Sequence, residues 1–265
     1  VDVAVSTPRI IAALVEEAVS VGDVVKLFSL GKGSANLLEL TLPDGSHCIG
    51  KTVEEITKEE RFVGKTTILG AGYGMGAQKF QAQLKTFGTE INEGEAKHIM
   101  DIYRSTYGMI PKLWSQAGEV IEAMAMNQTV TFGNGCVSVS GKKGILMPNG
   151  MYQRCPNLRL VLDDNGKNQY VYDAKRGINK IYGGKLVENV CQGIARCVIG
   201  EQMIKIAKRY KVVLTVHDAI ACIAKEEEVD EAKAYVEECM RWVPEWAEGL
   251  PLNCESGYGK SYGDC

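Results

Sequence analysis

The sequence predicts a mixed α+β fold, and three observations support this prediction. Stretches with the 3.6-residue apolar period of helices occupy residues 91–127 and 185–209. Between them, from 129 to 182, clusters of Gly, Asn and Asp such as GNG, PNG and DDNGKNQ separate short strand-like segments, which is typical of β-hairpins. Two apolar strand segments at 211–224 flank His217-Asp218. Helices and hairpins therefore alternate in blocks along the chain.

The remaining elements follow from local patterns. The capping-box spacing from Thr57 to Glu60 predicts the start of a helix, and an acidic helix is expected at 226–242. Ahead of these we expect a strand at 1–6, a helix at 9–25 and a hairpin at 37–50 around a Pro-Asp-Gly turn. We expect four regions along the chain, namely 1–50, 51–128, a β-hairpin-rich insertion at 129–184, and 185–265.

Composition excludes several classes of protein. No apolar run reaches the roughly 18 residues of a membrane span, and the N-terminus lacks the pattern of a signal peptide, so we expect a cytoplasmic protein without membrane contact. The nine cysteines form no CxxC pair, which argues against a disulfide framework or a zinc site. Because the net charge is −3, any nucleic-acid binding must depend on local basic patches. The insertion offers such a patch, or else a solvated β surface, with Lys142, Lys143, Arg154, Arg159, Lys175, Arg176 and Lys180.

A glycine-rich stretch at 61–76, RFVGKTTILGAGYGMG, allows two interpretations. A dinucleotide-binding turn needs G-x-G-x-x-G after a strand, whereas these glycines recur at every second position and a capped helix precedes them. A phosphate-binding Walker loop is excluded because no GK[ST] ends the run. The alternative is a helix that presents one functional face.

The helical interpretation places Arg61, Lys65, Leu69 and Tyr73 on one face, because they are four residues apart. Two cations one turn apart can bind a polyphosphate, and an aromatic ring further along can lie against a base. The glycines after Leu69 would allow movement where the helix ends. An ordinary exposed basic face explains the same periodicity equally well.

Three motifs, taken in order, resemble those of the family A (Pol I-like) DNA polymerases of phage type. They are R-x3-K-x7-YG at Arg61, Lys65, Tyr73 and Gly74, similar to motif B; LVENVCQGIAR at 186–196, similar to the helix whose glutamine, here Gln192, contacts primer-template; and TVHDAIA at 215–221, similar to motif C. The C-terminal run WAEGLPLNCESGYGKSYGDC is also similar. The resemblance covers roughly residues 50–265 and implies a right-hand polymerase palm with an antiparallel sheet and largely helical fingers.

The family's motif A, a strand that ends in Asp with an Arg seven residues later, has one candidate here. Asp2 and Arg9 have this spacing, but the family's aromatic residue is missing between them and Thr7 replaces its glutamate. Motif C departs as well, since Ala219 follows Asp218 where the family often has Glu. These departures keep open a catalytically weak or inactive polymerase-like DNA-binding protein.

The resemblance implies Mg²⁺-dependent transfer of a nucleotide from a dNTP to a primer 3′-hydroxyl. Asp2 and Asp218 would be the catalytic residues that hold two Mg²⁺ ions, with Mn²⁺ as a substitute. Arg61, Lys65, Leu69 and Tyr73 would bind the dNTP, and Gln192, His217 and Arg9 the primer-template DNA. The resemblance also implies an upstream polymerase segment or a partner chain, and a site of action in a bacterial or phage-infected cell. A dinucleotide-dependent enzyme is the least favoured alternative.

Overall fold

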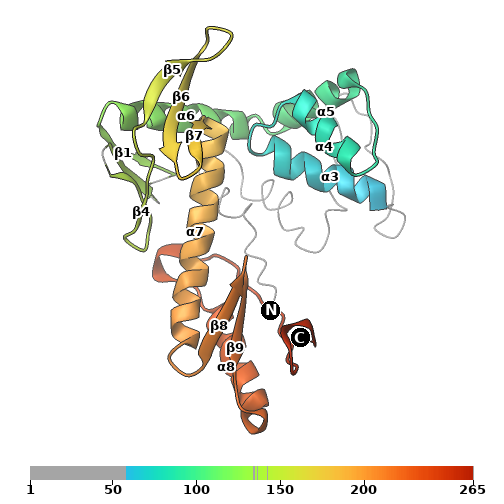
Figure 1. The fold of residues 1–265 in the computed structure, drawn as a ribbon, viewed down its shortest axis with the longest axis vertical. Coiled ribbons are helices and arrows are strands. Elements are labelled where there is room, and N and C mark those ends of the chain that lie inside the picture. Colours follow the sequence, from blue (N-terminus) through green and yellow to red (C-terminus); the bar gives the residue numbers. More distant parts are fainter. Residues whose placement is uncertain (1–57, 134, 136, 142, 265) are drawn as a thin grey trace.

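The computed structural model describes residues 58–264 apart from 134, 136 and 142 (Figure 1). The predicted α+β class is confirmed. The helices are α3 (Lys58–Ala71), α4 (Ala77–Thr86), α5 (Glu93–Thr106), α6 (Met109–Ala125), α7 (Gly183–Ile206) and α8 (Val229–Arg241). The strands are β1 (Thr129–Phe132), β2 (Val137–Ser140), β3 (Gly144–Leu146), β4 (Tyr152–Gln153), β5 (Arg159–Leu162), β6 (Asn168–Ala174), β7 (Gly177–Ile181), β8 (Lys211–Val216) and β9 (Ala219–Ile223). Three short 3₁₀ turns cover Glu226–Glu228, Glu245–Ala247 and Tyr262–Asp264.

Helices α3 to α5, together with the start of α6, form a small helical unit with its own core. α5 begins with a capping box in which the Asn92 side chain accepts from the Glu95 backbone and the Glu95 side chain accepts from the Asn92 backbone. The core side chains recur at helical spacing and are Ala71, Phe80, Leu84, Ala96, Met100, Tyr103 and Ile110. α3 is described from Lys58 onward, while Thr57 and the predicted capping box lie outside the described residues.

The hairpin-rich segment forms two antiparallel sheets, in the orders β1-β2-β3-β4 and β5-β6-β7. The first sheet packs against α6 and the N-terminal half of α7, so that Phe132, Val139 and Ile145 share a core with residues of both helices. The second sheet is anchored at Val171 and Ile181 and extends away from α7 at the top of Figure 1. The predicted β-hairpins are therefore confirmed.

Helix α7 connects the two halves of the molecule. Its 24 residues give it a length of about 36 Å, since each helical residue adds 1.5 Å. The N-terminal half packs in the core of the first sheet, and the C-terminal half packs with α8 and the β8–β9 hairpin through Ile199, Ile206 and Ile220. Gln202 is fully buried there and donates to the Met240 and Trp242 carbonyls, which joins α7 to the end of α8.

The predicted elements at 1–6, 9–25 and 37–50 lie outside the described residues, as does the predicted boundary at residue 50. The other predicted boundaries cut through one packed body, because α6 on one side and α7 on the other share a core with β1–β3. Within the described part of the chain, no helix is long and apolar enough to cross a membrane.

Candidate active site

The candidate site begins where α3 ends in a Schellman motif. The Met75 amide donates to the Gly70 carbonyl at 3.0 Å and the Gly74 amide donates to the Ala71 carbonyl at 3.1 Å. Gly74 has the left-handed conformation that this motif requires, with φ of 80°. Tyr73 is therefore the C-cap residue, and its position is set by the way the helix terminates.

Close packing explains two of the glycines in this stretch. A Cβ atom on Gly72 would lie 2.8 Å from the Ile68 carbonyl oxygen, and one on Gly70 would lie 2.7 Å from the Met75 sulfur. The glycines follow a helix and are followed by α4, so the strand that a dinucleotide-binding turn requires is not there. The dinucleotide interpretation is thus wrong, and the predicted helix is confirmed, while the functional face assigned to it stays a prediction.

The Tyr73 side chain lies against α7. Its ring packs on the core that includes Cys191, and burial raises the pKa of its hydroxyl well above the ordinary value. Cys191 and Glu188 add to that rise in pKa, so both side chains are near the ring. The Tyr73 backbone is equally close to α7, because a Cβ atom on Gly184 would lie 2.5 Å from the Tyr73 carbonyl oxygen.

Glu188 connects this region to Gln192, the predicted DNA-binding residue. Its carboxylate accepts from Gln192 Nε2 at 3.2 Å and from Lys185 Nζ at 2.9 Å. Gln192 is exposed, so its side chain is available to a ligand. The structure thus places Tyr73 and Gln192 on either side of Glu188. Sequence analysis missed Glu188 and Lys185, although their spacing of four and seven residues before Gln192 indicates a common helix face.

His217 and Asp218 form the two-residue turn of the β8–β9 hairpin. Val216 pairs with Ala219, so the turn contains only these two residues. A two-residue hairpin loop needs a positive φ, which glycine adopts most easily, yet His217 takes it with φ of 53°. Backbone strain of this kind is concentrated at functional sites. In Figure 1 the turn points toward the half of the molecule that holds α3.

One side of the β8–β9 hairpin is uncovered. Val213, Leu214 and Ile223 are 49%, 42% and 58% exposed, which is high for large apolar side chains in strands. Among the described strands, β8 and β9 pair only with each other, so each retains an unpaired backbone edge. The opposite side is covered at Ile220, which is buried in a core with residues of α7 and α8.

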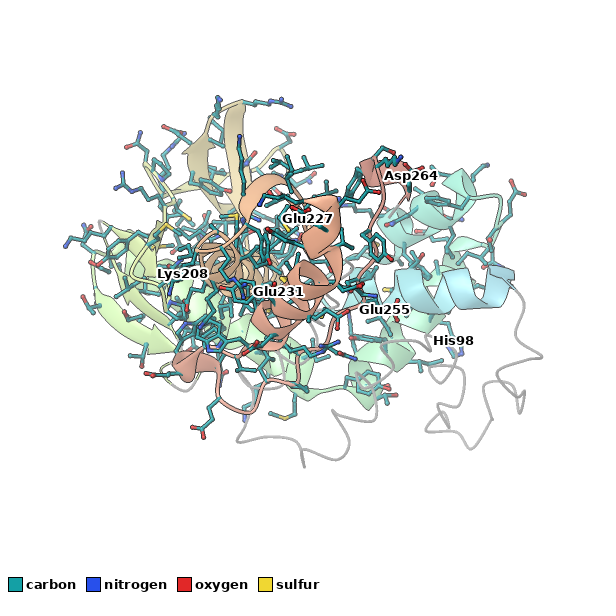
Figure 2. The ribbon with its side chains drawn as sticks, turned by 90° about the horizontal axis from the view of Figure 1, so that it is seen from below. His98, Lys208, Glu227, Glu231, Glu255 and Asp264 are labelled. Carbon is teal, nitrogen blue, oxygen red and sulfur yellow. The ribbon has the colours of Figure 1, made fainter. Side chains whose placement is uncertain are left out.

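The remaining predicted residues are placed only in part. Leu69 is 54% exposed on α3, as expected for a contact with a ligand. Arg61 and Lys65 also lie on α3, but their side chains are outside the described set, as are Asp2 and Arg9 entirely. Within residues 58–264, less the three gaps, no cluster of three or more His, Cys, Asp or Glu is arranged to hold a metal ion. His98, expected to have no functional role, is exposed on α5 (Figure 2).

Comparison with known proteins identifies the fold. The chain is 30% identical over 217 residues to the DNA polymerase of Bacillus phage SP02, a match that includes 77% of the chain. Its structure superposes on the POL domain of Pol1 from M. smegmatis, solved in complex with DNA primer-template and dNTP, with a TM-score of 0.58 over 98% of the chain and 19% identity. The chain is a relative of the DNA polymerases. The predicted resemblance to a phage DNA polymerase is confirmed, and the fold is similar to that of the Pol1 polymerase domain. No family model matches the chain.

A second kind of relative matches a shorter part of this polymerase-like chain. The potassium uptake protein TrkA of the Trk system of Mycobacterium tuberculosis is 55% identical over 56 residues, which is 21% of the chain. The chain covers 26% of that protein, 33% of the phage polymerase and 39% of the Pol1 structure. It therefore spans about a third of the polymerases that it matches.

Proposed function

We propose that this chain provides the palm and fingers of a family A DNA polymerase and takes part in template-directed DNA synthesis. The observation that carries this proposal is the strained His217-Asp218 turn beside an uncovered sheet edge, on a fold shared with a polymerase domain. The relationship to a phage polymerase over 77% of the chain supports it. We place its site of action in the cytoplasm of a bacterial or phage-infected cell.

The proposed metal is Mg²⁺, and the described residues fit it as far as they reach. Asp218 offers a half-buried carboxylate that has no hydrogen bond or ion pair within the described part of the chain. Carboxylate oxygens are the ligands that Mg²⁺ prefers, and Mn²⁺ accepts the same ligands. When bound, a pair of such ions would lower the pKa of a primer 3′-hydroxyl and neutralise the pyrophosphate leaving group.

A second carboxylate is needed beside Asp218, and Asp2 is our candidate. A strand at residues 1–6 that pairs with the free edge of β8 or β9 would cover the exposed side chains of Val213 and Leu214. The same pairing would bring Asp2 to the turn. An upstream polymerase segment or a partner chain would provide the equivalent strand if residues 1–6 do not.

The substrate contacts divide between α3 and α7. The proposed dNTP site uses Arg61 and Lys65 for the triphosphate, and Leu69 and Tyr73 for the base and sugar. Leu69 is exposed and Tyr73 lies at the junction of the two helices, which supports their role at the nucleotide. Primer-template DNA would be contacted by Gln192 from α7, by His217 from the turn and by Arg9.

A primer-extension assay tests this function. The parent protein should extend a primer with Mg²⁺ or Mn²⁺, and Asp218→Ala should reduce the rate about a thousandfold or more, because metal ligation supplies several kcal/mol. Asp2→Ala should cause a similar loss if Asp2 is the second ligand. Asp164→Ala, an exposed acid on the β5–β6 turn, is the control and should extend normally.

A non-catalytic DNA-binding protein is the second candidate function. The absence of a second acid after Asp218 favours it, since buried Ala219 stands there. Binding of primer-template without extension, equal in the parent and in Asp218→Ala, would support this candidate and exclude the polymerase. Extension that is lost in Asp218→Ala but kept in Asp2→Ala would instead show that the second ligand lies elsewhere.

A further inference from the structure

The loop between α3 and α4, residues 72–76, is held by side chains of two other helices. The indole Nε1 of Trp114 on α6 donates to the Gly72 carbonyl at 3.0 Å. The guanidinium Nη2 of Arg104 on α5 donates to the Met75 carbonyl, also at 3.0 Å. Both bonds are partly buried, and the two carbonyls lie on either side of Tyr73 and Gly74. We call these two contacts the Tyr73 clamp.

The clamp also contacts α7, through the backbone of Trp114. A Cβ atom on Gly183 would lie 1.8 Å from the Trp114 carbonyl oxygen, so the backbones of α6 and α7 touch at this point. One turn of α6 therefore contacts α7 with its backbone and the Tyr73 loop with its indole. Any displacement of Trp114 would move Tyr73 relative to Glu188 and Gln192.

Unpaired polar atoms surround the clamp. The hydroxyls of Tyr103 and Tyr107 and the Nε of Arg104 are buried and have no hydrogen-bond partner in the described part of the chain. Leaving such groups unpaired costs free energy, so buried polar atoms are normally paired with protein, water or a ligand.

We infer that Trp114 and Arg104 are positioning residues for nucleotide binding, because they fix the C-terminal end of α3 and the Tyr73 ring against α7. This inference rests on the proposed polymerase function. Neither side chain needs to touch the nucleotide. The clamp keeps the loop in the arrangement that binds dNTP, and a protein that populates this arrangement less often binds its ligand more weakly in proportion.

The test compares variants that each remove one donor. Trp114→Phe keeps an aromatic ring and Arg104→Met keeps the aliphatic stem, so the main change is the lost hydrogen bond. Each should raise the KM for dNTP about fivefold, the factor that corresponds to one net hydrogen bond, with kcat changed less than about twofold. Arg104→Lys retains a donor and should restore the parental KM. Trp246→Phe is the matched control, because it removes an indole bond of 2.8 Å to Glu201, in the C-terminal half of α7 and outside the loop at 72–76.

Two results would overturn the inference while leaving the proposed function intact. One is a parent that extends primers together with an unchanged KM in both clamp variants. The other is a lower kcat and a lower Tm with unchanged KM, which indicates loss of active protein and a purely structural role.

A second measurement does not depend on activity. Amide hydrogen exchange in residues 73–76 of the nucleotide-free protein should be faster in Trp114→Phe and Arg104→Met than in the parent and in Trp246→Phe. Equal exchange in all four proteins would show that there is no clamp. If the parent fails to bind or incorporate dNTP, the proposed function fails, and faster exchange would still support the clamp as a contact that positions Tyr73.

Discussion

At the scale of single residues, His217 at the candidate site has a backbone conformation that glycine and asparagine adopt more easily. Three non-glycine residues in the described part of the chain have left-handed φ values, and two of them are Asn127 and Asn157. Asparagine tolerates this conformation because its short amide bonds locally to the backbone. His217 has no such amide, and its left-handed conformation at the turn is consistent with the contact to primer-template DNA proposed for it.

Replacing His217 with glycine should therefore separate stability from function. We expect His217→Gly to raise the free energy of unfolding by about 0.5–1 kcal/mol, since relief of the left-handed strain exceeds the entropy cost of glycine. Primer extension should fall in the same variant. Urea unfolding measures the first effect, and Asn127→Gly, with φ of 58° at its parent residue, is the control that should change less. A loss of stability in His217→Gly would mean that the imidazole makes favourable contacts instead.

At the scale of elements, α8 contacts the C-terminal segment through the Glu237 carboxylate, besides an Arg241–Asn253 hydrogen bond. Glu237 accepts a hydrogen bond from the Ser256 hydroxyl and another from Arg241 Nη2 at 2.9 Å. The Ser256 and Arg241 contacts lower the pKa of Glu237 below its ordinary value of 4.5. Cys254, which lies two residues before Ser256, is buried in the same core as α8. The segment is thus attached to α8 by a group that titrates in acid.

This contact should weaken on acidification. Because the pKa of Glu237 is lowered by folding, its stabilisation is complete above pH 4.5 and is lost as the pH falls through the lowered value. Hydrogen-exchange protection around residues 253–256, taken relative to the intrinsic exchange rate at each pH, should fall in the parent as the pH drops below 4.5. In Glu237→Gln the segment should be less protected already at neutral pH and should show little further change in acid. A Glu238→Gln variant should behave like the parent, and a pH-independent parent would contradict this prediction.

The elements were predictable from the sequence, but their packing was not. The structure confirms three local patterns. They are the turn residues between strands at 129–182, the helical period of 91–127 and the two apolar strand segments on either side of His217. Each of these patterns depends on residues that are close together in the sequence. The clamp on Tyr73 joins residues 29 and 42 positions apart, which no local pattern reveals. Glu188 could have been predicted from the sequence, because helix periodicity places it one turn from Gln192. Its proximity to Tyr73 depends on how α3 meets α7.

At the scale of the whole molecule, exposed charges of both signs lie around α8, among them Glu227, Glu231 and Lys208, which Figure 2 labels. The β5–β7 sheet at the other end carries Lys175, Arg176 and Lys180 exposed on and beside β7. Of the other residues of the predicted basic patch, Arg154 and Lys143 are also exposed, and Arg159 forms an ion pair with Asp173. That this surface binds DNA stays a prediction.

Lys175, Arg176 and Lys180 lie on or beside β7, the strand that precedes α7 and the candidate site. We therefore expect them to contact the phosphates of primer-template DNA. Reversing all three to Glu should weaken DNA binding and reduce the slope of log K against log salt by about 0.9 for each lost phosphate contact. The control is a reversal of Lys208, Lys211 and Lys225, which carries the same charge change at the opposite end of the molecule. Fluorescence anisotropy of labelled primer-template across a salt series measures both. If the two triple variants lose affinity equally and with the same slope, net charge alone accounts for the effect. If only the β7 variant has the shallower slope, the sheet lies along the DNA backbone.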